Sequence, residues 1–260
     1  MASSVIVPSC RISVIWAVYG FLVLRSVFGD GDLFKSKAAY YGSSDSLGTP
    51  NGSCGYGSFG RTINGGQVAA ASDLYKDGIG CGSCYQITCT NEKLCTQEGI
   101  TIVVTDYGKG NGTEFILSST AYSKLAKPGK AKQLISLGVV DIEYKGVSCK
   151  YPGYNLMIKI DESSNFPDYL AIQFWYQGGQ KDILSIELFQ EKNGEQETGK
   201  GMKRNHGAVW DVVGPPKGAL WLRFLAGGYR RTSFEWIRAA NAIPANWEAG
   251  ALYDSGIQIS

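Results

Sequence analysis

Three carboxylates are placed along the chain where acid–base chemistry would need them. Asp106 ends the apolar run TIVVTD, Glu114 precedes the apolar run FILS, and Asp45 follows AYYGSS. Cleavage of a glycosidic bond needs two carboxyl groups across a groove, one protonated to donate to the leaving oxygen and one ionised to activate water or attack. Aspartate is also common in turns, so a structural role for each carboxylate stays open.

Most other catalytic arrangements are excluded by residues that the sequence lacks. The one histidine is His206 in the second half, so a Ser-His-Asp or Cys-His site in the first half is excluded. Zinc sites built from several histidines are excluded for the same reason. No glycine-rich loop precedes the Lys-Ser/Thr pair that a phosphate cradle needs. We therefore expect no cofactor and no metal site.

The composition favours a mostly β protein that does not bind nucleic acid. The formal net charge is only +2 and no long block of Lys or Arg occurs, which argues against a nucleic-acid partner. The 34 glycines and the 12% aromatic share favour many turns and little helix. Short apolar runs such as NLMIKI and ILSIELFQ, separated by turns, predict an antiparallel sandwich in the second half. SSTAYSKLAK predicts a helix that Ser118 or Ser119 caps.

The N-terminal segment predicts export from the cell. Arg11 precedes ISVIWAVYGFLVL, an uncharged run that is shorter than the ~20 residues of a comfortable membrane span. We interpret residues 1–29 as a signal peptide that is cleaved near Gly29, with a retained signal anchor as the alternative. The cleaved chain is expected to be secreted, extracellular and without a membrane segment.

Cysteine usage agrees with export. The chain after the signal segment holds an even number of cysteines, all in its first half: Cys54, Cys81, Cys84, Cys89, Cys95 and Cys149. Such a cluster predicts three disulfides, although the spacing does not choose among the possible pairings. CGSC is also a zinc-binding spacing, which would suit a reducing compartment instead. Asn51-Gly-Ser53 and Asn111-Gly-Thr113 are acceptor sequences for N-glycans.

The distribution of cysteine divides the exported chain into two domains. Residues 30–151 hold all six cysteines, and residues 153–260 hold none. Pro152-Gly153 in CKYPGYN would break any strand, so we expect the boundary there. The cysteine-free domain must be stabilised by its own core. Its tyrosines and tryptophans could also pack against the C–H faces of sugar rings, if some of them face outward.

Several separated motifs resemble those of plant expansins, most closely the expansin-like B group. They are YYGSSDSLGTPNGSCGYGSFGRTINGG, LYKDGIGCGSCYQITC, VVTDYGKGNGTEFILSSTAYSKLA, GVVDIEYKGVSC, HGAVW and AIPANWEAGALYDSGIQI. The resemblance covers nearly the whole exported chain. It implies an all-β fold, a six-stranded double-psi β-barrel related to family-45 endoglucanases, followed by an immunoglobulin-like β-sandwich. It also implies the disulfides Cys54–Cys81, Cys84–Cys149 and Cys89–Cys95.

The resemblance implies a secreted, monomeric cell-wall protein without evident hydrolytic activity. Such a protein binds wall polysaccharide, namely cellulose, xyloglucan or xylan, and modifies or loosens the wall. A weak or relic glycoside hydrolase is one alternative. A secreted defence or signalling module is another.

This sequence matches some of the family's cleft residues and replaces others. Tyr41 matches the cleft tyrosine, Asp45 matches an acidic residue shortly after it, and Asp106 ends its strand beside the cleft. The family's His-Phe-Asp strand becomes Glu114-Phe115-Ile116, so Ile116 replaces the position of the general acid in the related endoglucanases. A hydrocarbon side chain cannot donate a proton, so hydrolysis is not expected and conventional wall loosening is put in doubt.

The polysaccharide-binding residues that the resemblance implies lie in the second domain. Tyr169 matches one member of an exposed aromatic platform. His206 stands where the family has a tryptophan, and Trp210 matches the second tryptophan of that motif. The expected platform is therefore thinner than in the family.

Overall fold

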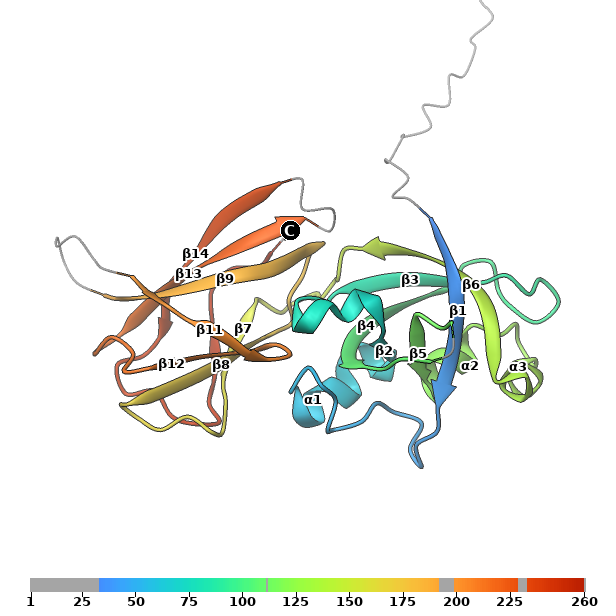
Figure 1. Ribbon diagram of the computed structural model, residues 1–260, viewed down its shortest axis with the longest axis horizontal. Helices are drawn as coiled ribbons and strands as arrows, with labels where there is room; N and C mark the ends of the chain where they lie inside the picture. The colour runs from blue at the N-terminus through green and yellow to red at the C-terminus, as the bar shows by residue number, and fades with distance from the viewer. Residues whose placement is uncertain (1–32, 111, 192–198, 229–232, 260) are drawn as a thin grey trace, which may run out of the picture. The chain divides into compact units, whose positions relative to one another are not determined.

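The computed structural model describes residues 33–110, 112–191, 199–228 and 233–259 (Figure 1). The predicted signal peptide and the second sequon residue, Asn111, lie outside the described residues, so both stay predictions. Residues 31–260 form one compact unit. Among the described residues, no helix has both the length and the apolar character that crossing a bilayer requires.

The first half of the unit is a closed six-stranded barrel with the strand order β1-β5-β2-β4-β3-β6. Two pairs, β1 with β5 and β2 with β4, are parallel, and the other four pairs are antiparallel. The strands are β1 Phe34–Tyr41, β2 Val68–Ala71, β3 Cys84–Cys89, β4 Ile100–Tyr107, β5 Phe115–Ser118 and β6 Val139–Val147. The predicted six-stranded barrel is confirmed.

Side chains alternate between the interior and the outside of this barrel. In β5, Phe115 and Leu117 are fully buried in the barrel core, whereas Ile116 between them is half-buried. Period-two alternation of this kind follows from strand geometry. It places Ile116 on the outer face of the barrel.

Short helices connect the strands of the barrel. They are α1 Gly57–Thr62, η1 Ile63–Gly66, η2 Asp73–Gly78, α2 Ser119–Lys124 and α3 Ala131–Leu137. The helix predicted from SSTAYSKLAK is α2, and the Ser118 hydroxyl accepts the hydrogen bond from Ala121 N that caps it.

The second half is a sandwich of two antiparallel sheets, as predicted. One sheet has the order β11-β12-β8-β7-β15 and the other has the order β10-β9-β13-β14. The strands are β7 Met157–Ile160, β8 Tyr169–Trp175, β9 Lys181–Gln190, β10 Lys200–Gly201, β11 Lys203–His206, β12 Val209–Val213, β13 Leu220–Gly228, β14 Phe234–Ile243 and β15 Leu252–Asp254. Buried apolar side chains from both sheets, such as Ile172 and Phe224, form one core between them.

Three disulfides stabilise the barrel. They join Cys54 to Cys81, Cys84 to Cys149 and Cys89 to Cys95, which are the pairs that the family resemblance implies. None of these cysteines is therefore free to form the alternative zinc site.

Candidate functional site

A row of directly paired residues crosses the outer face of the barrel and connects Ile116 to Asp106 through Ala70. Ala39 of β1 pairs with Ile116 of β5, Ile116 pairs with Ala70 of β2, and Ala70 pairs with Asp106 of β4. Directly opposed residues of neighbouring strands place their side chains on the same face. We call Ala39, Ile116, Ala70 and Asp106 the barrel floor.

Asp106 is the carboxylate of the barrel floor, and a loop of the barrel lies against it. Asp106 Oδ1 accepts hydrogen bonds from the backbone N–H groups of Ser53, at 2.6 Å, and Tyr107, at 2.7 Å. Gly52 approaches so closely that a Cβ atom there would lie 2.6 Å from Thr105 O and 3.3 Å from Asp106 Cβ. The loop before Cys54 therefore fits Asp106 because residue 52 has no side chain.

Tyr41, at the end of β1, contributes a buried hydroxyl group. Within the described ranges this hydroxyl has no hydrogen-bond partner. Burial and, second, the negative charge of Asp106 raise the pKa of Tyr41 to about 12. The hydroxyl is therefore protonated at physiological pH and keeps a donor that no group of the described residues uses.

Glu114 is engaged in a structural contact. Its side chain is 9% exposed, and Oε1 accepts a hydrogen bond at 2.9 Å from the backbone N–H of Leu74, in the first turn of η2. Burial raises the pKa of Glu114, which the backbone hydrogen bond from Leu74 partly offsets. This carboxyl group caps a helical segment, so it does not stand free as an acid opposite Asp106.

Asp45 is also held by structural partners. It forms an ion pair with Arg61 of α1 and accepts hydrogen bonds at 3.1 Å from Ser43 Oγ and from the backbone N–H of Leu47. The same arginine donates through Nε to Gly48 O at 3.1 Å. Asp45 therefore fixes the loop after β1, which is the structural role that its sequence context left open.

On the sandwich, Tyr169 lies in a polar cluster on the outer face of the five-stranded sheet. Its hydroxyl donates to Asp211 Oδ2 at 2.8 Å, and Asn205 Nδ2 donates to the same oxygen at 2.7 Å. Burial and the hydrogen bond to Asp211 raise the pKa of Tyr169. The ring is therefore held in one position by β11 and β12.

Trp210 is buried, which corrects the expectation that it adds to an exposed platform. It is 5% exposed and pairs with Ile172, another residue of the sandwich core. The Arg204 guanidinium lies 4.2 Å from the centre of its ring. Because Trp210 and Val212 face inward, Asp211 between them faces outward, so the sheet offers a carboxylate where a tryptophan was expected.

His206 is exposed and lies at the contact between barrel and sandwich. A Cβ atom on Gly55 would meet His206 Nε2 at 3.1 Å, so the barrel loop passes directly beside the imidazole ring.

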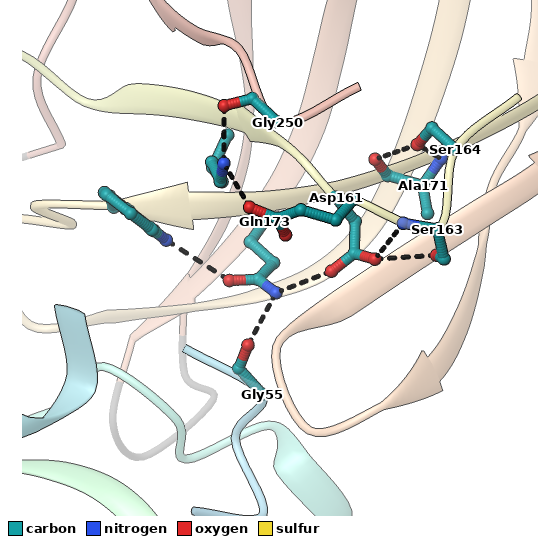
Figure 2. A network of polar contacts seen from close by, with 10 residues as sticks. Gly55, Asp161, Ser163, Ser164, Ala171, Gln173 and Gly250 are labelled. Atoms are coloured by element: carbon teal, nitrogen blue, oxygen red, sulfur yellow. Dashed lines mark hydrogen bonds and ion pairs between the residues drawn. The ribbon is translucent and has the colours of Figure 1, made fainter. Parts of the chain in front are cut away.

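Sequence reasoning missed Gln173, which is the centre of a polar network on the same sheet face (Figure 2). Gln173 Nε2 donates to Gly55 O at 2.8 Å and to Asp161 Oδ2 at 3.1 Å, and Gln173 Oε1 accepts from Trp175 Nε1 at 3.2 Å. Trp175 in turn stacks on Phe59 of α1, with ring centres 4.1 Å apart and planes 3° from parallel. The alternation of DYLAIQFW places Tyr169, Gln173 and Trp175 on one face, which is the signal that could have found them.

Two glycines allow the backbones of the barrel and the sandwich to come into direct contact. A Cβ atom on Gly78 would collide with the backbone of Gly207, and one on Gly207 would collide with the backbone of Ser53 and Cys54. Arg204 Nη1 donates to Gly78 O at 3.1 Å and to Gly207 O at 2.7 Å. Burial lowers the pKa of this arginine. The two halves therefore meet backbone to backbone, with one guanidinium joining them.

Together these groups can bind a polar chain but lack the pair of free carboxylates that hydrolysis uses. Asp106 offers an acceptor and Tyr41 offers a donor on the barrel, and Tyr169 and Asp211 offer both on the sandwich. On the barrel floor, Ala70 is paired with Asp106, and Ile116 lies one strand further away. The two other candidate acids, Asp45 and Glu114, are occupied by structural contacts.

Comparisons with known proteins agree with both halves of the fold. Residues 67–144 match a family model described as lytic transglycolase, and residues 156–244 match the expansin C-terminal domain. An expansin-like B1 of Oryza sativa subsp. japonica is 48% identical, covering 92% of this chain and 93% of the relative. An expansin-like B1 of Arabidopsis thaliana is 49% identical, covering 88% and 90%.

Solved structures of a bacterial expansin share the fold. The apo expansin of Clavibacter michiganensis superposes with a TM-score of 0.62 at 17% identity, covering 87% of this chain and 98% of that chain. A variant of that expansin was solved in complex with cellohexaose, and it superposes with a TM-score of 0.61 at 17% identity, covering 86% and 96%.

Proposed function

Because the chain belongs to the expansin family, in its expansin-like B group, we propose that it is a secreted cell-wall protein that binds wall polysaccharide and modifies or loosens the wall without hydrolysing it. The proposed ligand is a neutral β-linked glycan such as cellulose, xyloglucan or xylan. Cellohexaose in the related bacterial structure supports a cellulose-like chain as the first to test.

The observation that carries the non-hydrolytic proposal is the composition of the barrel floor. Asp106 is followed across the strands by Ala70 and Ile116, so the position nearest to it offers hydrocarbon instead of a second carboxyl group. General acid catalysis typically contributes about 10²–10⁴-fold to rate, and hydrocarbon cannot supply it. Binding does not need this group.

The path that the ligand takes is supported by the continuity between the two halves. Asp106 accepts a hydrogen bond from Ser53, and the carbonyl of Gly55 accepts one from Gln173 of the five-stranded sheet. We infer that a polysaccharide chain contacts Tyr41 and Asp106 on the barrel and Tyr169 on the sheet. His206 lies beside the loop that joins them and is included in the proposed surface.

The test measures binding and sugar release on the same preparation. We expect the purified protein to be depleted from solution by cellulose or xylan while no soluble reducing ends accumulate, and Tyr169→Ala to weaken the depletion several-fold. Steady release of reducing ends that is lost in both Asp45→Ala and Asp106→Ala would overturn the proposal. Extension of isolated walls under load, measured in parallel, tests the loosening part.

A weak glycoside hydrolase is the second candidate, because burial raises the pKa of Glu114 and so favours the protonated form that a general acid needs. The matched pair Ile116→Asp and Ile116→Asn separates the two. If a missing acid is the only defect, Ile116→Asp gains hydrolysis and Ile116→Asn does not. Activity that is present in the unmodified protein and lost in Glu114→Gln would favour this candidate over binding alone.

A further inference from the structure

Five lysines gather on one part of the barrel that the proposed function does not use. Lys93 lies in the loop that the Cys89–Cys95 disulfide closes. The other four, Lys124, Lys127, Lys130 and Lys132, run from the end of α2 into α3. We call these five residues the lysine patch.

The structure holds the two segments of the lysine patch together. Lys127 donates through its backbone N–H to Leu94 O at 2.7 Å and through Nζ to Glu92 O at 2.6 Å. Thr96 N donates to Leu125 O at 2.9 Å, and Cys95 forms an isolated β-bridge with Ala126. Helices α2 and α3 pack against each other beside this loop (Figure 1). The two segments that carry the lysines therefore lie side by side, and a disulfide and several backbone hydrogen bonds keep them in place.

The two segments that carry the lysine patch contain a single acidic residue. No Asp or Glu occurs between Glu114 and Asp141, and Glu92 is the one acidic residue in the disulfide loop. Lys127 contacts the backbone carbonyl of Glu92, not its carboxylate. In the described part of the chain, none of the five lysines forms an ion pair, and Lys93, Lys124, Lys127 and Lys132 are exposed. A chain with a formal net charge of only +2 thus concentrates several positive charges on one face.

We propose that the lysine patch binds a carboxylated polysaccharide, a polyuronate, as a second ligand beside the neutral glycan. Ammonium groups on flexible stems act as point charges, which suits an extended chain of regularly repeated carboxylates. The aromatic residue nearest in sequence, Tyr122, is fully buried, so it offers no ring face for stacking on neutral sugars. The choice of a polyuronate over other polyanions rests on the proposed location in the wall.

The experiment compares the migration of the full mature protein in native gels that contain polygalacturonate, neutral β-glucan or no polymer. We expect polygalacturonate to retard the protein at low salt and to lose its effect at high salt, because exposed charges are screened. The double variant Lys124→Gln/Lys132→Gln should weaken this binding at least about tenfold, since each lysine near an anionic surface contributes appreciably. Lys150→Gln/Lys217→Gln is the matched control, because it removes the same charge from exposed lysines outside the patch.

Equal loss of polygalacturonate binding in both double variants would overturn the proposal, because net charge alone would then explain it. Tighter binding to vesicles of phosphatidylcholine with phosphatidylserine than to polygalacturonate would also overturn it, in favour of a membrane surface. Failure of the proposed function gives a different result. The unmodified protein would then bind neither cellulose nor neutral β-glucan, whatever happens in the polygalacturonate gel.

Discussion

Asp106 of the barrel and Gln173 of the sandwich both form hydrogen bonds to the loop of residues 53–55. Asp106 accepts the N–H of Ser53 at 2.6 Å, and Gln173 donates to the carbonyl of Gly55 at 2.8 Å. Between them, Cys54 is tied to Cys81 and its carbonyl accepts the N–H of Ala208 at 3.0 Å. The carboxylate of the barrel floor and the polar face of the sheet are thus joined through three consecutive residues.

Gln173→Leu should therefore destabilise the protein and weaken its polysaccharide binding together. The residue is 3% exposed and its amide bonds to Gly55, Asp161 and Trp175, so its loss leaves half-buried polar groups without these partners. A fully buried group left unpaired costs about 1–3 kcal/mol, and a half-buried group costs less because water reaches it in part. Chemical denaturation should show a lower free energy of unfolding. Gln133→Leu, at an exposed position on α3, should change neither property, and equal effects of the two substitutions would contradict the structural role.

Tyr41→Phe should weaken polysaccharide binding without destabilising the protein, unlike Gln173→Leu, which should lower both. The hydroxyl is buried and has no hydrogen-bond partner among the described residues, so its removal should leave the free energy of unfolding unchanged or raise it by up to about 1 kcal/mol. If the hydroxyl donates to the ligand, affinity for the neutral glycan should fall several-fold. Isothermal titration with cellohexaose and denaturation on the same samples check both signs. A variant that binds as well as the unmodified protein would remove Tyr41 from the proposed surface.

Glu114 should make the protein less stable as the pH rises. Its pKa in the fold lies above the ordinary value of 4.5, so the folded state keeps the proton longer than the unfolded state. The free energy of unfolding should fall as the pH rises through the unfolded pKa toward the folded one, and then level off. Glu114→Gln keeps an acceptor for Leu74 and cannot ionise, so the difference between the two proteins should grow across that window. Glu98→Gln, at an exposed position, is the control and should leave the slope unchanged.

A glycan on Asn51 should reduce access to the barrel floor. Asn51 is exposed, and Gly52 and Ser53 of the same sequon lie directly against Asp106. Protein secreted from a glycosylating host should carry one glycan there by mass spectrometry, and enzymatic removal should increase binding to cellulose. Ser53→Ala destroys the sequon and keeps the backbone N–H that Asp106 accepts, so it should match the deglycosylated protein. Unchanged cellulose binding after removal of the glycan would disprove the obstruction.

The sequence predicts the fold well because its signals are local or shared across the family. Short apolar runs between turns predict the strands of the sandwich, Ser118 predicts the start of α2, and the family motifs predict the barrel and the cysteine pairs. The replacement at Ile116 was also readable, because the strand around it keeps its pattern. That Ile116 lies two strands from Asp106 on the same face could be established only from the pairing register of β5, β2 and β4.

The roles of the candidate side chains were harder to predict, because their partners are distant in the sequence. Asp45 and Glu114 look like free carboxylates until Arg61 and Leu74 are placed beside them. The exposed position expected for Trp210 came from the family motif, whereas alternation around Asp211 places Trp210 and Val212 on the core side of the strand. Gln173 lies in a strand of mostly apolar residues, and its contact with Gly55 of the barrel loop cannot be read from that strand.

Gly78 of the barrel lies directly against Gly207 of the sandwich. These two glycines therefore help to set the relative position of Asp106 and Tyr169, although neither glycine is part of the proposed binding surface. A single methyl group at either position would wedge the barrel away from the sandwich, because backbone and not a flexible side chain lies opposite. An alanine at residue 78 or 207 would thus misalign Asp106 with Tyr169 while leaving both side chains intact. A polymer long enough to span both halves would sense that error, and a short oligosaccharide held by one half would not. Comparing the affinities of such a variant for the two ligands would measure how much polysaccharide binding depends on the spacing between the barrel and the sandwich.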